Sequence, residues 1–190
     1  MTRRPFAALV LVALSAMVLT VTTAAPAGAD MSIRLEKKVV GDLRRGDRDA
    51  VSSYLLTNGE PDATNNDGEP LLVIAARHNK PDMIDLLLRH GARVNATDRL
   101  GNTALFWAAD AGHTPITRAL IEAGAKVDSQ NRQGLTPLMT AVRAGHMEIV
   151  RTLVAGGADP RTADYTGRDA FGWAVGPRGP LLVNELNKAQ

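Results

Sequence analysis

Apolar side chains recur along this 190-residue chain with the spacing of one buried helical face. The spacing is i, i+1, i+4 and i+5, which places four side chains on one stripe of an α-helix. The stripe occurs at Ala50, Val51, Tyr54 and Leu55, at Met83, Ile84, Leu87 and Leu88, and at Ile149, Val150, Leu153 and Val154. Successive stripes lie 33 and 66 residues apart, so the pattern predicts a repeated helical unit.

The positions between these stripes keep the same 33-residue interval. Glycine recurs at Gly68, Gly101, Gly134 and Gly167, and an Asn or Asp stands three residues earlier, at Asn65, Asp98, Asn131 and Asp164. Two further columns are Gly46, Asn79, Gly112 and Gly145, and Asn58, Gly91, Gly124 and Gly157. Gly and Asn tolerate the left-handed backbone that often ends a helix. The copies align without insertion or deletion, which predicts an all-α repeat solenoid.

The residues that follow the repeated glycines resemble the ankyrin repeat. They read GEPLLVIAA from Gly68, GNTALFWAA from Gly101, GLTPLMTAV from Gly134 and GRDAFGWAV from Gly167. The resemblance implies about five stacked helix-turn-helix units with hairpin-like fingers, and it covers residues 30–190. The units are expected at about 33–65, 66–98, 99–131, 132–164 and 165–190, with the first and last acting as caps.

The helix ends differ between units. Thr103, Thr136 and Asp169 are expected to cap the first helices of their units through side-chain oxygens, whereas Pro70 cannot. Ankyrin repeats often carry a His that hydrogen-bonds within and between units, so its absence predicts that this polar network is missing. The column of that His holds Val73, Phe106, Met139 and Gly172. We therefore predict that apolar packing holds the N-terminal half and that this half frays first. Gly176–Pro180 should break the helix pair of the last unit.

The N-terminal segment has a different composition. Arg3 and Arg4 precede an apolar run from Phe6 to Val21 and small residues that end at Ala29, which predicts a signal peptide over residues 1–29. An uncleaved membrane anchor is the alternative. Either way the arginines favour a cytoplasmic N-terminus, which places the repeats in the periplasm or outside the cell. The protein would contact the membrane only if the leader stays uncleaved.

Charge and cysteine content narrow the range of possible functions. The chain has 22 Lys and Arg against 20 Asp and Glu, and the two arginines of the leader account for the excess. The remaining domain is therefore neutral, which gives no indication of a nucleic-acid partner. The sequence contains no Cys, which excludes disulfides and thiol chemistry.

The sequence offers little for catalysis. Of its four His residues, His113 and His146 lie one 33-residue interval apart, which is too far for both to bind one metal ion and favours structural roles at helix starts. No metalloprotease, serine-hydrolase, phosphate-loop or EF-hand motif occurs. We predict that the protein is not an enzyme and uses no metal or cofactor.

The resemblance implies that a partner protein binds to the finger tips and to the exposed face of the first helices. Trp, Tyr and Arg are the residue types most enriched at such interfaces, and several fall in these columns. The predicted contact residues are Arg99, Leu100, Trp107, Asp110, Arg132, Gln133, Thr140, Arg143, Tyr165 and Trp173. Core packing of Trp107, end-capping by Trp173 and simple solvation of the arginines are the alternatives.

These observations predict an exported, monomeric adaptor that binds another protein. The resemblance adds the possibility of an accessory factor for a periplasmic enzyme such as a catalase. Two alternatives remain: a periplasmic protein that binds a small ligand or metal in its aromatic groove, and an exported effector that acts on a host protein. A concave pocket around Trp107 and Trp173 with convergent polar groups would favour the ligand-binding alternative, whereas an open flat groove would favour a protein partner.

Overall fold

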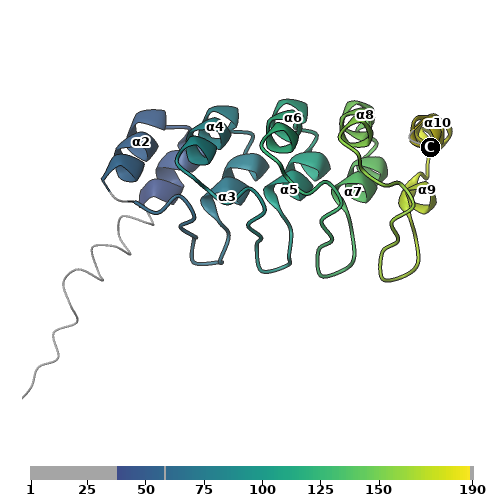
Figure 1. Ribbon diagram of the computed structural model, residues 1–190, viewed down its shortest axis with the longest axis horizontal. Coiled ribbons are helices and arrows are strands. Elements are labelled where there is room, and N and C mark those ends of the chain that lie inside the picture. The colour runs from purple at the N-terminus through teal and green to yellow at the C-terminus, as the bar shows by residue number, and fades with distance from the viewer. Residues whose placement is uncertain (1–37, 58, 189–190) are drawn as a thin grey trace, which may run out of the picture.

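Helices pair in sequence order and stack in a single row in the computed structural model, which describes residues 38–57 and 59–188 (Figure 1). Residues 38–45 are helical and precede α2 (Arg48–Leu56). The next helices are α3 (Leu71–Arg77), α4 (Pro81–Arg89), α5 (Ala104–Ala111), α6 (Thr114–Glu122), α7 (Pro137–Ala144), α8 (Met147–Ala155), α9 (Ala170–Trp173) and α10 (Gly179–Asn187). The all-α repeat solenoid predicted from the sequence is confirmed.

The stack has two helical layers. Helices α3, α5, α7 and α9 contact one another in order, and α2, α4, α6, α8 and α10 form the second row. Small residues at the centre of the first layer, such as the fully buried Ala75 and Ala108, let neighbouring helices approach closely. Most residues of the predicted stripes on the second helices, including Ile84 and Val150, are buried. The exceptions are half-buried: Ala50, Tyr54, Leu88 and Val154. Each unit therefore buries its apolar face against its neighbours, as expected for a solenoid.

The fingers project from one side of the row and repeat one hydrogen-bond pattern (Figure 1). The Asx residue at the base of each finger donates its backbone N–H to the carbonyl four residues later, as in Asp98 to Asn102. Its side-chain Oδ1 accepts from the backbone N–H groups two and four residues later; for Asp98 these belong to Leu100 and Asn102, each at 2.9 Å. The same pattern occurs at Asn65, Asn131 and Asp164. The Asx column is thus required by the shape of the finger.

The helix ends follow the sequence closely. Thr103, Thr136 and Asp169 accept from backbone N–H groups three residues later, so all three predicted caps are confirmed. Helix α3 begins after Pro70 without a side-chain cap, as predicted. Asn79 has a φ of 52° at the position where the neighbouring units have left-handed glycines.

The C-terminal unit is shorter than the others. Helix α9 has only four residues, and the chain is non-helical over residues 174–178. The first three residues of the predicted break lie in this interval, whereas Gly179 and Pro180 begin α10. Leu182 and Leu186 of α10 are buried, whereas Leu181 is 62% exposed. The unit closes the row with two of its three leucines.

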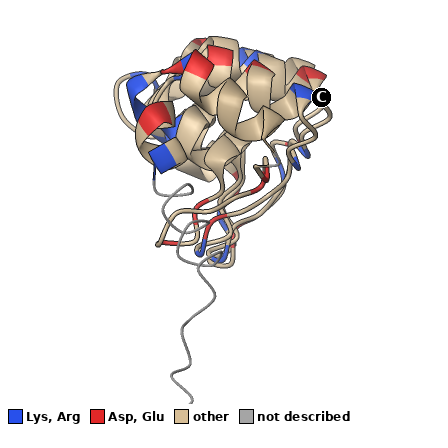
Figure 2. Cartoon of the chain, turned by 90° about the vertical axis from the view of Figure 1, so that its left-hand side faces the viewer, with Lys and Arg blue, Asp and Glu red and all other residues tan. Residues whose placement is uncertain are grey.

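Some predictions fall outside the described residues. These are the leader over residues 1–29, the start of the first helix over residues 33–37, and Asn58. Among residues 38–57 and 59–188, no helix has the length and apolar character needed to span a membrane. Lys and Arg are interspersed with Asp and Glu over both helices and fingers, so the view along the row shows no face of a single charge (Figure 2).

Candidate functional site

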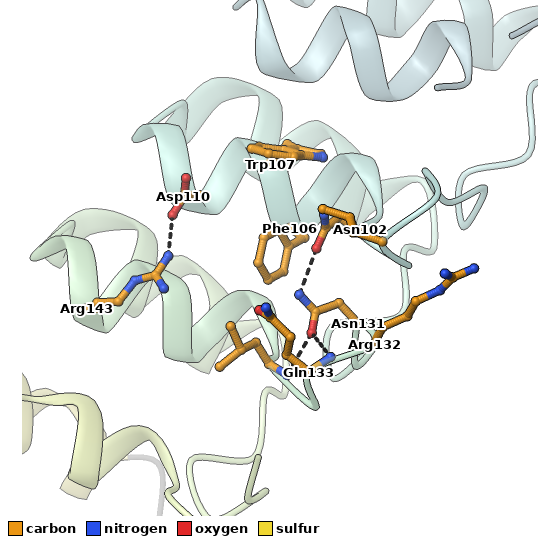
Figure 3. Close-up of a pocket in the computed structure, with 10 residues that line it drawn as sticks. Asn102, Phe106, Trp107, Asp110, Asn131, Arg132, Gln133 and Arg143 are labelled. Carbon is orange, nitrogen blue, oxygen red and sulfur yellow. Dashed lines mark hydrogen bonds and ion pairs between the residues drawn. The ribbon is translucent and has the colours of Figure 1, made fainter. Parts of the chain in front are cut away.

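A hollow of about 190 Å³ opens where two neighbouring fingers meet α5 and α7 (Figure 3). Its lining comes from the fingers of units 99–131 and 132–164 and from the first helices that follow them. Six of the ten predicted contact residues line it: Leu100, Trp107, Asp110, Arg132, Gln133 and Arg143. The structure therefore gathers most of the predicted residues at one place.

The floor of the hollow is an apolar cluster that is separate from the main core. Phe106, Leu135 and Met139 form it, with exposed fractions of 6%, 7% and 1%. Trp107 meets Phe106 edge to face, with ring centroids 6.0 Å apart and planes at 85°. Trp107 and Trp173 are each only partly buried and pack against this cluster from neighbouring positions. Phe106 is thus the core member of the Phe-Trp pair, and Trp107 keeps an accessible surface.

Trp107 is held in place by the base of the preceding finger. Its indole Nε1–H donates to Asp98 Oδ2 at 2.9 Å. Burial alone would raise the pKa of Asp98, but hydrogen bonds from Asn102 and Trp107 outweigh it and hold that pKa below its ordinary value. The guanidinium of Arg77 lies 5.3 Å from the centre of the Trp107 ring, within the range of cation–π attraction. The ring is therefore fixed before any partner arrives, which reduces the entropy lost on binding.

A buried hydrogen bond joins the two fingers behind the hollow. Asn131 Nδ2 donates to Asn102 Oδ1 at 2.8 Å, and Asn102 Nδ2 donates to Asp98 Oδ2 at 3.0 Å. The prediction concerned only the polar network of the missing His, and this bond joins the two units through other residues. Asx and Asn side chains of the fingers make the connection.

One wall of the hollow is closed by contacts around Asp110. Its Oδ1 accepts from the hydroxyl of Thr140 at 2.6 Å and from Arg143 at 3.0 Å. Its backbone carbonyl lies 3.0 Å from His146 Nε2. Thr140 is only 1% exposed, so the prediction that it contacts a partner is corrected: it supports Asp110 from below.

The outer rim of the hollow is formed by Leu100, Arg132 and Gln133. Leu100 is 60% exposed although it is apolar, and both Arg132 and Gln133 are exposed. The first atoms of the Arg132 side chain pack against Gly101 of the preceding finger. A Cβ at Gly101 would lie 3.5 Å from Arg132 Cγ. The Arg132 side chain then extends outward from the hollow, away from Phe106 (Figure 3).

The other predicted residues lie on either side of the hollow. Arg99 donates to the carbonyl of Asn66 at 2.8 Å on the preceding finger. Tyr165 is 72% exposed on the following finger. Trp173 repeats the geometry of Trp107, since its Nε1–H donates to Asp164 Oδ2 at 3.1 Å and Arg143 lies 5.7 Å from its ring centre. Arg168 is an additional contact, 3.7 Å from the ring centre. These residues extend the surface along the fingers without lining the hollow.

Two family models match the chain. The model described as "Ankyrin repeats (3 copies)" matches residues 43–131, and the model described as "Ankyrin repeat" matches residues 133–165. The chain belongs to the ankyrin-repeat family. The comparison with curated proteins returned no match. Ankyrin repeats generally mediate protein–protein interaction, so binding of another protein is the general role of this fold.

In this ankyrin stack, four residues that line the hollow were not among the contact residues predicted from the sequence: Asn102, Phe106, Asn131 and Leu135. Phe106 and Leu135 are apolar residues in expected core columns, and nothing in their types separates a satellite cluster from the main core. A signal for the fixed tryptophans did exist. Asp98 and Asp164 each precede a Trp by nine residues, whereas Asn65 and Asn131 precede Ile74 and Thr140. Asp, whose carboxylate can accept the indole N–H, therefore occurs in the units that have a Trp nine residues later.

The hollow contains no arrangement typical of catalysis. Asp110 and Arg143 neutralise each other, and the Asn side chains bond to one another. Over the part of the chain that the structure describes, no group of three or more His, Asp or Glu side chains could hold a metal ion. What the surface offers is an apolar depression with fixed aromatic walls and a polar rim, which is the usual composition of a binding site on a protein surface.

Proposed function

We propose that this protein is a non-catalytic, exported adaptor that binds a partner protein through the hollow and the adjoining fingers. One observation carries the proposal: an open apolar depression whose Trp107 is held by Asp98 and whose rim presents the exposed Leu100. Binding energy at protein interfaces concentrates in a few aromatic and Arg residues around such depressions. The hollow supplies both types.

The size of the hollow favours a protein partner over a small ligand. Sites for small molecules usually enclose about 300–1,000 Å³. The hollow is smaller, at about 190 Å³, and the side chains of Asn102, Asn131, Asp110 and Arg143 that line it are already paired within the chain. Such a depression suits one side chain of a larger partner, with further contacts along the fingers. We therefore place the ligand-binding alternative second.

Export to the periplasm or beyond rests on the leader over residues 1–29, and a monomeric state is part of the same proposal. Within an exported setting, service to a periplasmic enzyme such as a catalase is the most specific form of the proposal, and it rests on the family resemblance. The effector alternative has no separate observation in its favour.

The test is affinity capture of the full chain, tagged at its C-terminus, from periplasmic extract of its own organism. A double variant, Leu100→Ala with Arg132→Ala, removes two exposed rim side chains that make no side-chain hydrogen bond or ion pair in the described residues. Trp107→Ala is less suitable, because it would leave Asp98 without one of its donors. The matched control is Arg118→Ala with Glu122→Ala, two exposed changes on α6 of the opposite layer.

We expect one stoichiometric protein to be recovered by the native chain and the control, and lost with the rim variant. Titration calorimetry with that purified protein should then give one binding site per chain. Equal recovery by the rim variant would move the interface elsewhere. Absence of any specific protein would count against the adaptor function and bring the ligand alternative forward.

A further inference from the structure

Apart from the exposed amide of Gln133, the polar side chains that line the hollow are satisfied within the chain, with one ionised exception. Asp110 accepts from Thr140 and Arg143, and Asn102 and Asn131 bond to each other. In residues 38–57 and 59–188, the guanidinium of Arg132 is the only charged group lining the hollow without a hydrogen bond or ion pair. The rim therefore presents one unpaired positive charge.

The packing of the fingers fixes where the Arg132 side chain begins. The backbone N–H of Arg132 donates to the carbonyl of Leu100 at 2.9 Å. Its side chain begins against Gly101, where a Cβ would lie 3.5 Å from Arg132 Cγ. Arg99 begins in the same way against Gly68 but then donates to the carbonyl of Asn66. The Arg132 side chain begins in the same way, but its guanidinium makes no hydrogen bond or ion pair in the described residues.

The carboxylates near the rim do not compensate this charge. Asp98 is 9% exposed and accepts from Leu100, Asn102 and Trp107. Asp110 is paired with Arg143. An exposed guanidinium binds a carboxylate through two parallel hydrogen bonds, a geometry that a Lys cannot reproduce. Charge complementarity at this rim thus favours an acidic group on the partner.

The floor indicates what lies beside that acidic group. A cavity of about 150 Å³ lined by apolar side chains can hold a benzene molecule, so the 190 Å³ of the hollow admits one aromatic or large aliphatic side chain. Phe106 and Trp107 already meet edge to face, and a further ring would find the same preferred geometry. The guanidinium points away from Phe106, so the carboxylate belongs to a neighbouring residue of the partner (Figure 3).

We propose that the partner docks through a short segment that places one aromatic or large aliphatic side chain in the hollow and an Asp or Glu, within three residues of it, on Arg132. Residues of an extended segment advance about 3.3 Å each, so residues one to three apart lie about 3 to 10 Å from each other. This inference rests on the proposed function, because it names the chemistry of the partner at the same site.

The test uses a phage-displayed library of random 12-residue peptides, selected on the full-length gene product as the expression host processes it. Enriched peptides are synthesised with fluorescein, and their dissociation constants are measured by fluorescence anisotropy. Three proteins are compared: the native chain, Arg132→Glu, and the matched charge reversal Arg118→Glu on the opposite layer. Both arginines are exposed, so each variant is expected to fold, and circular dichroism checks this.

We expect the enriched peptides to share an apolar anchor with an acidic residue within three positions. Arg132→Glu should weaken their binding at least about tenfold, while Arg118→Glu should leave it unchanged. Replacing the acidic residue of the peptide by Arg should weaken binding to the native chain and restore binding to Arg132→Glu. That reciprocal rescue requires direct contact between the two charges.

Other outcomes separate this inference from the proposed function. Peptides that bind with an anchor alone, unaffected by Arg132→Glu, would overturn the acidic requirement and leave the interface in place. Enrichment of basic peptides, or no enrichment, would overturn the proposal that a short segment with an apolar anchor and an acidic residue binds the hollow. The capture experiment would still decide independently whether a partner protein binds this face.

Discussion

Units 66–98 and 132–164 occupy equivalent places in the stack but stabilise their first helices in different ways. Helix α3 has no side-chain cap at Pro70 and buries Leu71–Ala76 as an unbroken apolar run. Its last residue, Arg77, donates to Glu69 of the same unit at 2.9 Å and lies over the Trp107 ring of the next unit. Helix α7 is capped by Thr136 and has Thr140 in its buried run. Thr140 and Arg143 bond to Asp110 of the preceding unit.

The difference shows that one backbone position can be held by two kinds of interaction. Apolar burial is insensitive to direction, whereas hydrogen bonds across a unit boundary fix the register of neighbouring helices. The apolar unit lies near the N-terminal end of the row. The hydrogen-bonded unit forms one side of the hollow, where the positions of Asp110 and Arg143 matter for binding.

The largest expected effect comes from shortening the apolar side chain that distinguishes α3. Ile74 is fully buried, so Ile74→Ala should lower the free energy of unfolding by about 3 kcal/mol through lost burial and the resulting cavity. Thr140→Ala at the equivalent position should cost only about 1 to 2 kcal/mol, because it removes one hydrogen bond and little volume. Urea denaturation followed by circular dichroism measures both. Equal losses would show that the two helices depend on the same interaction.

A second prediction concerns local opening. A helix without a side-chain N-cap, such as α3, is less stable by about 1 kcal/mol. Asn79, at a φ of 52°, adds backbone strain that glycine at the same position avoids. Amide hydrogens of α3 and α4 should therefore exchange through openings that are easier by about 1 to 2 kcal/mol than those of α7 and α8. Native-state hydrogen exchange measured by NMR compares them directly. Uniform protection along the row would contradict the idea that the N-terminal half frays first.

A third prediction exchanges the helix starts. Thr136→Ala removes the acceptor for the N–H of Met139 and should cost about 1 kcal/mol. Pro70 has an extended backbone with ψ at 150°, which suits a capping Thr, so Pro70→Thr should gain about 0.5 kcal/mol. Thermal unfolding of the two variants checks both signs. A loss on Pro70→Thr would mean that the rigidity of proline contributes more to this turn than a cap would.

Much of this fold follows from the sequence because its constraints are local. The 33-residue register gives the helix pairs, the Asx column gives the fingers, and Thr103 and Thr136 give the helix starts. Each of these depends on residues within one unit. Repetition then makes the same local rule visible several times.

The site was only partly predictable because it depends on contacts between units. Arg132 and Trp107 were found from their columns, but Thr140 in the same column as Trp107 is buried beneath Asp110. Column position fixes where a Cα lies, while the neighbouring unit decides whether a side chain is covered. The Asn102–Asn131 hydrogen bond could not be predicted for the same reason, since neither residue alone indicates its partner.

The smallest expected effect lies in the Asx column, where Asn131 cannot titrate and Asp164 can. The hydroxyl of Thr166 donates to Asp164 at 2.6 Å, and with further donors that include Trp173 it lowers the pKa of Asp164 to about 2. Because the folded-state pKa lies below the usual 3.8, ionised Asp164 stabilises the fold above about pH 4, and this contribution is lost as the pH falls toward 2. The last unit should then be sensitive to acid at this position, and the Asn131 finger should not.

The indole N–H resonance of Trp173 reports this titration, because it donates to the carboxylate that is protonated. We expect its NMR shift to stay constant from neutral pH down to about pH 3.5 and to move only below that value. Asp164→Asn, which copies the residue of the neighbouring finger, should remove the pH dependence while keeping an oxygen acceptor. A transition centred near pH 4 would mean that the finger leaves this carboxylate in an ordinary, solvated state. The Asn and Asp fingers would then differ in sequence without differing in how strongly they hold the base of the finger.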